Sequence, residues 1–165
     1  MSGCWTGSFI IARIIIDHYK IVYDFTTLNS DPLLCGVNNR NHCPYCLASK
    51  HVDLFRAGDR LNACKGRMQA VGLAWKPSQN KYGSQFGELM IIHLCKECGS
   101  VSFNRVAADD NFEKLINLFA QTVTMDKSSR ARFQQCGFHL LEAQHQQEFE
   151  RCLFGSIKSK VADYF

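Results

Sequence analysis

The sequence has no apolar run long enough to cross a membrane. Its best candidate, residues 9 to 16, is interrupted by Arg13 and is far shorter than the roughly 20 residues that a spanning helix requires. The N-terminal residues also lack the basic region with which a secretory signal begins. We therefore expect a soluble, cytoplasmic protein without a membrane partner.

The motifs of well-known enzyme classes are also missing. There is no H-E-x-x-H, no G-x-S-x-G and no phosphate-binding loop. The CPYC string does not fit the deaminase pattern, because its proline lies inside the cysteine pair and no H-x-E precedes it. We expect the adjacent Asp109 and Asp110 to form a solvated turn and a helix cap. No nucleophile–base pair is evident, so an enzyme is the less favoured hypothesis, with candidate residues His51, Asp53, Cys64 and Arg105.

An excess of one charge is nearly absent too. The chain of 165 residues carries 19 Lys and Arg against 15 Asp and Glu, a formal charge of +4. The whole excess lies between residues 40 and 110, which hold ten basic and six acidic residues and five of the nine cysteines. This weak basic footprint permits nucleic-acid binding without being diagnostic of it.

The composition is that of a globular protein, with 46% apolar residues and twelve phenylalanines to fill a core. Residues 1–34 are rich in β-branched and aromatic types and predict a β-prone extension. Residues 35–110 hold most of the glycines and short apolar runs, which favour short strands joined by turns. Residues 111–165 have helical periodicity. The sequence therefore predicts an α+β protein with a small β-rich core and C-terminal helices.

Three segments predict particular elements. Residues 76 to 88 are typical of an exposed hairpin loop that leads into the strand before the second cysteine pair. Asp110, followed by Glu113, indicates a capped helix over residues 111 to 123. After a polar joint, MDKSSRAR, apolar spacing predicts a second helix over residues 139 to 154.

Two cysteine pairs carry the strongest chemical signal. Cys43 and Cys46 stand in CPYC, and Cys95 and Cys98 stand in CKECG. A spacing of two residues lets a tight turn point both sulfurs at one ion, and two such turns supply the four thiolates of tetrahedral zinc. Gly99 suits a turn residue with positive φ. The spacing predicts one structural zinc, bound by all four cysteines in a zinc-ribbon-like domain.

Other interpretations of the cysteines stay open. A rubredoxin-type iron centre uses the same four thiolates. A disulfide framework is disfavoured in a reducing compartment, and a thioredoxin-type pair would open a helix after an apolar strand. Cys64 is either a free thiol or a ligand in an altered set with one of the histidines. Because a thiolate-only site is simpler, we expect packing or ligand-supporting roles for His42, His51, His93 and Cys64.

Five blocks in a fixed order resemble one family: RNHCPYCLASKHVD, AGDR, NACKGRMQAVGLAWK, GELMIIHLCKECG and SFNRVAADDN. They cover about residues 38 to 115 and are similar to the RNHCP domain, a small zinc-ribbon-like family without an established biochemical function. The resemblance implies metal binding through the four cysteines. Family members often carry a further CxxC upstream, where this chain has only Cys35. The polar motif positions include Arg40, Asn41, Asp53, Asp59, Arg60, Asn104, Asp109, Asp110 and Asn111.

Two functional hypotheses follow. The first is an adaptor that binds RNA, DNA or a ribonucleoprotein, by analogy with other zinc ribbons. Its expected contacts are Arg40, Lys50, Arg56, Arg60, Lys65, Arg67 and Arg105. The alternative is a protein–protein scaffold that uses the C-terminal helices, with zinc as a stabiliser. Two of the arginines, Arg60 and Arg105, have an alternative role in bracing loops through pairs with Asp53 or Asp59.

Overall fold

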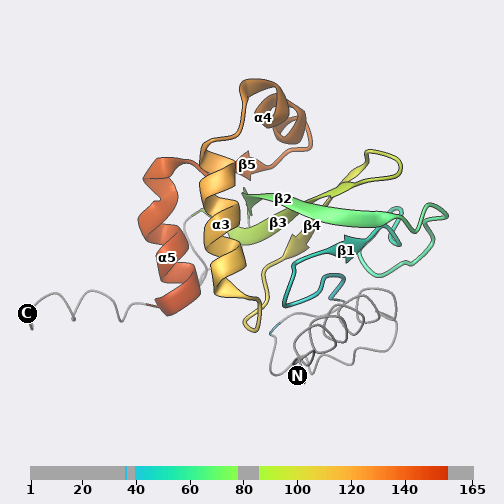
Figure 1. The fold of residues 1–165 in the computed structure, drawn as a ribbon, viewed down its shortest axis with the longest axis horizontal. Coiled ribbons are helices and arrows are strands. Elements are labelled where there is room, and N and C mark those ends of the chain that lie inside the picture. The colour runs from blue at the N-terminus through green and yellow to red at the C-terminus, as the bar shows by residue number, and fades with distance from the viewer. Residues whose placement is uncertain (1–35, 37–39, 78–85, 156–165) are drawn as a thin grey trace, which may run out of the picture.

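The computed structural model describes residues 36, 40–77 and 86–155 (Figure 1). An antiparallel sheet is combined with helices, which confirms the predicted α+β class. The expected N-terminal β-prone extension lies outside the described residues. The strands are β1 Ser49–Lys50, β2 Arg67–Lys76, β3 Glu88–Cys95, β4 Val101–Arg105 and β5 His139–Leu140. The helices are α3 Phe112–Val123, α4 Lys127–Gln134, the short 3-10 helix η1 Ala143–His145 and α5 Gln146–Phe154.

The sheet is built around the hairpin of β2 and β3. The strands follow the order β1-β2-β3-β4. Strand β5 pairs with the same edge of β2 as β1 does, but β1 pairs near the N-terminal end of β2 and β5 near its C-terminal end. Lys76 pairs with Glu88, so the expected hairpin is confirmed, although residues 78–85 of its loop lie outside the described part. Gly87, at φ +105°, is required there because a Cβ would lie 2.1 Å from the carbonyl oxygen of Lys76.

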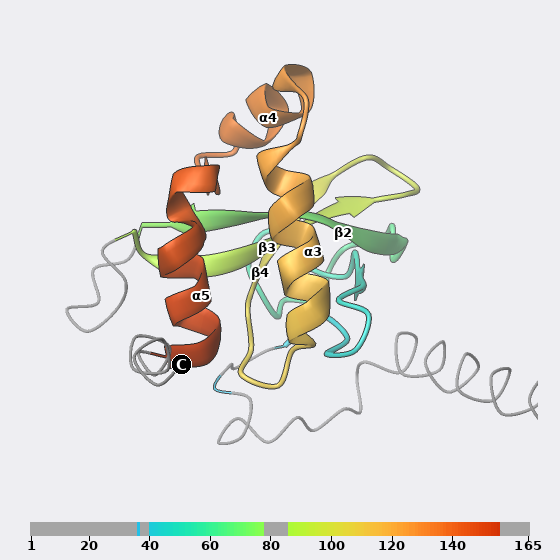
Figure 2. The ribbon, with the colours of Figure 1, turned by 60° about the vertical axis from the view of Figure 1, so that its left-hand side comes forward.

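Successive residues of β2 and β3 point to opposite faces of the sheet, and an apolar cluster lies on each face. Leu73 and Ile91 belong to the larger cluster, which α3 and α5 cover. These two helices lie side by side in both views (Figures 1 and 2), and the rings of Phe119 and Phe149 stack at 4.7 Å between them. The other cluster includes Phe133 of α4. All three helices thus pack on the sheet.

The structure changes three predictions about the C-terminal half. The helix expected from residue 111 is confirmed as α3, but its N-cap is Asn111, whose side chain accepts from Lys114 N, and not Asp110. The polar joint is a helix, α4, capped by Asp126. The helix expected from His139 begins only at residue 146, because β5 pairs with β2 first. No helix in the described ranges has the length and apolar content needed to span a membrane.

Candidate metal centre

Four potential ligands from three segments meet at one end of the sheet. His51 follows β1, Cys64 precedes β2, Cys95 ends β3 and Cys98 lies in the next turn. Their nearest ligand atoms all lie within 4.8 Å of one another, and they form the one such group found in the described residues. Gly99, at φ +71°, lets its N–H donate to Cys95 O and closes the turn as expected. The turn therefore aims both sulfurs at the same point.

The donor set and its spacing fit a tetrahedral zinc ion. Cys64 Sγ lies 3.7 Å from Cys95 Sγ. Zn–S bonds of about 2.3 Å at tetrahedral angles give sulfur–sulfur distances of about 3.8 Å. His51 Nδ1 lies 3.2 Å from Cys98 Sγ. Three sulfurs and one imidazole nitrogen form a common structural zinc shell. This group can hold a metal ion and is compatible with zinc.

Neighbouring residues hold these ligands in place. The Asn62 amide lies 2.7 Å from His51 Nε2 and so keeps Nδ1 turned toward the sulfurs. Backbone bonds from His51 N to Gly66 O and from Lys65 N to His51 O continue the pairing of β1 with β2. The hydrogen-bonded Ser100 hydroxyl, 3.2 Å from Cys98 Sγ, lowers the pKa of that thiol to about 6. A low pKa favours the thiolate that a metal needs.

Cys43 and Cys46 lie together, but outside this group. Their turn is closed by bonds from Leu47 N to Cys43 O and from Cys43 N to Ala48 O, both 2.8 Å. The hydrogen bond between the two thiols raises the pKa of Cys43 and lowers that of Cys46 to about 6. Their assignment to the same ion as Cys95 and Cys98 stays a prediction. The geometry supports the altered set, in which Cys64 and a histidine complete the shell.

The RNHCP domain family model matches residues 27–116, more than half of the chain. The chain belongs to the RNHCP domain family. No curated protein and no solved structure gives a significant match. The string RNHCP stands at residues 40–44 of this chain.

The first residue of the RNHCP string binds two carboxylates about 70 positions away. The Arg40 guanidinium donates to both Asp109 and Asp110. His42 Nε2 lies 2.9 Å from the Asp110 carboxylate, which also accepts from Ala107 N at 2.8 Å. The Asp110 side chain is fully buried, so the expectation of a solvated turn and cap is wrong for this residue. Buried carboxylates require such partners, and the string supplies them.

Asn41 of the string and His93 of β3 brace this part of the chain against neighbouring segments. Asn41 donates to Lys50 O at 3.0 Å and accepts from Arg60 at 2.8 Å. His93, in β3, lies 2.7 Å from Leu47 O through Nε2 and 3.0 Å from the Asn104 amide through Nδ1. Complete burial lowers the pKa of His93 to about 3, so the ring is neutral and donates to Leu47. The polar motif positions thus serve largely as internal braces.

The expected nucleic-acid contacts divide into two groups. Arg40, Arg60 and Arg105 lie against carboxylates, and the expected bracing of Arg60 by Asp53 is confirmed at 3.8 Å. Arg105 pairs with Glu88 instead of the expected aspartates. The exposed members of the set are Arg56, Lys65 and Arg67, and Lys50 is half-buried. Sequence reasoning did not single out two more exposed cations near the sheet, Lys96 and Lys114.

Proposed function

We propose that this RNHCP domain is a zinc-stapled module that binds single-stranded RNA. Zinc would be held by His51, Cys64, Cys95 and Cys98, where its role is to fix the ends of the loop between the first two ligands. The observation that carries the proposal is the form of that loop. Residues 53–61, called here the 53–61 loop, display an aromatic ring and a cation outward from a rigid base.

Two carboxylates that accept backbone N–H groups, those of Asp59 and Asp53, give the 53–61 loop its rigidity. Asp59 accepts backbone N–H groups from Arg56, Leu54, Phe55 and Leu61 at 2.8–3.1 Å. These bonds, that from Arg56 foremost, hold the pKa of Asp59 well below its usual range. The carboxylate of Asp53 accepts the backbone N–H groups of residues 58 and 60. Most N–H groups of the loop are thus satisfied within it, which leaves the side chains of Phe55 and Arg56 for other contacts.

The displayed side chains suit a single strand. Three large apolar side chains of this one loop are exposed, Leu54 by 50%, Phe55 by 81% and Leu61 by 66%, and apolar residues grouped on a surface mark interaction sites. Arg56 lies beside Phe55, and Lys65 follows just after the loop. Unpaired bases stack on aromatic rings, and nearby cations bind the phosphates. The 53–61 loop therefore combines the two features that single-stranded RNA recognition uses.

The proposal is tested by fluorescence polarisation of a labelled single-stranded RNA with the zinc-loaded full chain. We expect binding that weakens as salt rises. Phe55→Ala should weaken it by about 5-fold to 150-fold, because base–aromatic stacking contributes about 1–3 kcal/mol. Phe112→Ala, at an exposed position on α3, is the matched control and should change little. Absence of binding at low salt, or equal effects of the two variants, would overturn the proposal.

A second candidate function is a protein–protein scaffold. Three exposed apolar residues gather on α3 and α5: Phe112 contacts Phe154 at 6.1 Å between ring centroids, and Ile116 lies one turn along α3. Ile116→Asp leaves the sheet-facing side of α3 intact. A partner that co-purifies with the wild type after nuclease treatment, and is lost with this variant, would favour the scaffold. An unchanged set of partners would count against it.

A further inference from the structure

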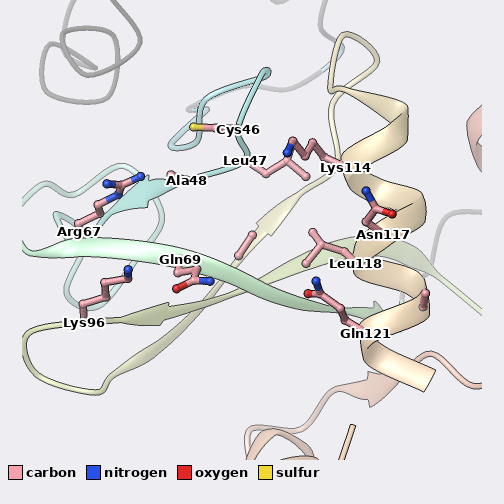
Figure 3. Close-up of a pocket in the computed structure, with 12 residues that line it drawn as sticks. Cys46, Leu47, Ala48, Arg67, Gln69, Lys96, Lys114, Asn117, Leu118 and Gln121 are labelled. Carbon is pink, nitrogen blue, oxygen red and sulfur yellow. The ribbon is translucent and has the colours of Figure 1, made fainter. Parts of the chain in front are cut away.

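A ligand-sized cavity lies apart from the 53–61 loop, between β2, α3 and the turn at residues 46–48. Its volume is about 600 Å³, which falls within the range of about 300–1,000 Å³ typical of small-molecule sites. Figure 3 shows Lys114 and Gln121 extending from α3 toward the strands, Asn117 between them on the same helix, and Arg67 and Lys96 on the opposite side. The cavity thus has two polar walls that face each other.

Cations predominate in this cavity. Three cations line it, Arg67 from β2, Lys96 from the turn after β3 and Lys114 from the first turn of α3, and none of the described residues that line it carries a carboxylate. The thiol of Cys46 lines the cavity too and lies close enough to Arg67 for their charges to interact. Lys114 lies in the first turn of α3, where a cation interacts unfavourably with the helix dipole. Cations on both sides of one cavity create a positive potential that attracts an anion.

The remaining lining resembles that of a site for a planar polar group. The amides of Gln69, Asn117 and Gln121 offer both donors and acceptors, and Leu47 and Leu118 supply apolar contacts. A base of a nucleotide needs an apolar surface for its ring faces and amide groups for its edges. We propose that this cavity binds a mononucleotide, with its phosphate held by the cations and its base by the amide and apolar lining. The site is separate from the 53–61 loop and goes beyond the proposed function.

The test is calorimetric titration of the zinc-loaded full chain with AMP and GMP, beside inorganic phosphate and adenosine. We expect saturable binding of at least one nucleotide, with phosphate alone and adenosine at least tenfold weaker. Lys114→Gln and Arg67→Gln should each weaken nucleotide binding at least tenfold, equivalent to about 1.4 kcal/mol. Lys127→Gln, at an exposed lysine of α4 outside the cavity, is the matched control and should leave affinity unchanged.

Three outcomes would overturn the inference. They are no saturable binding of either nucleotide, phosphate binding as tight as nucleotide binding, and nucleotide binding that both cavity variants leave unchanged. The two proposals fail separately, because Phe55→Ala should weaken RNA binding without affecting AMP or GMP. Conversely, Lys114→Gln should weaken nucleotide binding while RNA binding by the 53–61 loop is retained.

Discussion

Replacing Asp110 tests whether the RNHCP string is a structural clasp. Its carboxylate is fully buried and contacts Arg40, His42 and the backbone N–H of Ala107. Asp110→Asn keeps the shape but removes the charge that compensates Arg40, whose side chain is only 5% exposed. Removing one partner of a buried pair costs about 3–5 kcal/mol. We therefore expect Asp110→Asn to lower the free energy of unfolding by about 3 kcal/mol or more. That is a large part of the total, because native domains are stable by only about 5–15 kcal/mol.

The neighbouring carboxylate provides the control. Asp109 binds the same guanidinium, but its side chain is 46% exposed. Solvent screens such a pair, so Asp109→Asn should cost about 1 kcal/mol or less. The assay is urea unfolding followed by circular dichroism, at pH 7 and a fixed concentration of free zinc, because bound metal adds to the measured stability. Equal costs for the two variants would refute the reasoning that burial decides the worth of each carboxylate.

Three further predictions concern the fold. Gly87→Ala should lower the free energy of unfolding by more than about 1 kcal/mol, because its methyl group would collide with the backbone. Gly137 is also at positive φ but has nothing within 4 Å of a Cβ, so Gly137→Ala should cost less in the same thermal unfolding assay. Thr122→Val should cost about 1–3 kcal/mol in urea unfolding, because it leaves the buried N–H of Leu73 without its acceptor; an unchanged stability would contradict this. Removing residues 125–165 should expose the core face under α5 and produce binding of a hydrophobic dye, and a soluble, dye-negative fragment would show that the C-terminal helices are dispensable.

The sequence predicted the elements that depend on local signals. The hairpin of β2 and β3 and the helix α3 follow from apolar runs and a polar break that lie within about 15 residues of each other. Helix α4 was missed because its segment is polar nearly throughout and buries only Phe133, so it has no apolar stripe to detect. Its one signal was Asp126, whose side chain caps the helix by accepting from Ser129 N.

The composition of the candidate metal centre depends on strand register. Ser49 pairs with Met68, and Met68 pairs with Cys95, so three segments are aligned across β1, β2 and β3. This alignment brings His51 and Cys64 to the end of β3, although they are separated by 47 and 31 residues from their sulfur neighbours. Spacing within a CxxC pair is visible in a sequence. The register that selects a partner for that pair is not.

The contact of Arg40 with Asp110 is hidden for the same reason. The two residues are 70 positions apart, and the adjacent Asp109 and Asp110 look alike in the sequence. Only the packed structure shows that one is exposed and the other buried. The sequence did show a set of polar motif positions that includes these residues. It did not show that their partners are one another.

The central claim is that His51 and Cys64 complete the metal shell of Cys95 and Cys98. The most direct measurement is the zinc content per chain of purified His51→Ala and Cys64→Ser beside Cys46→Ser. We predict that each of the first two variants, like Cys98→Ser, should lose one equivalent of zinc and that Cys46→Ser should retain this equivalent. The claim is contradicted if Cys46→Ser loses the equivalent that Cys98→Ser loses while His51→Ala keeps it, because the ion would then be bound by the four thiolates of the two CxxC pairs.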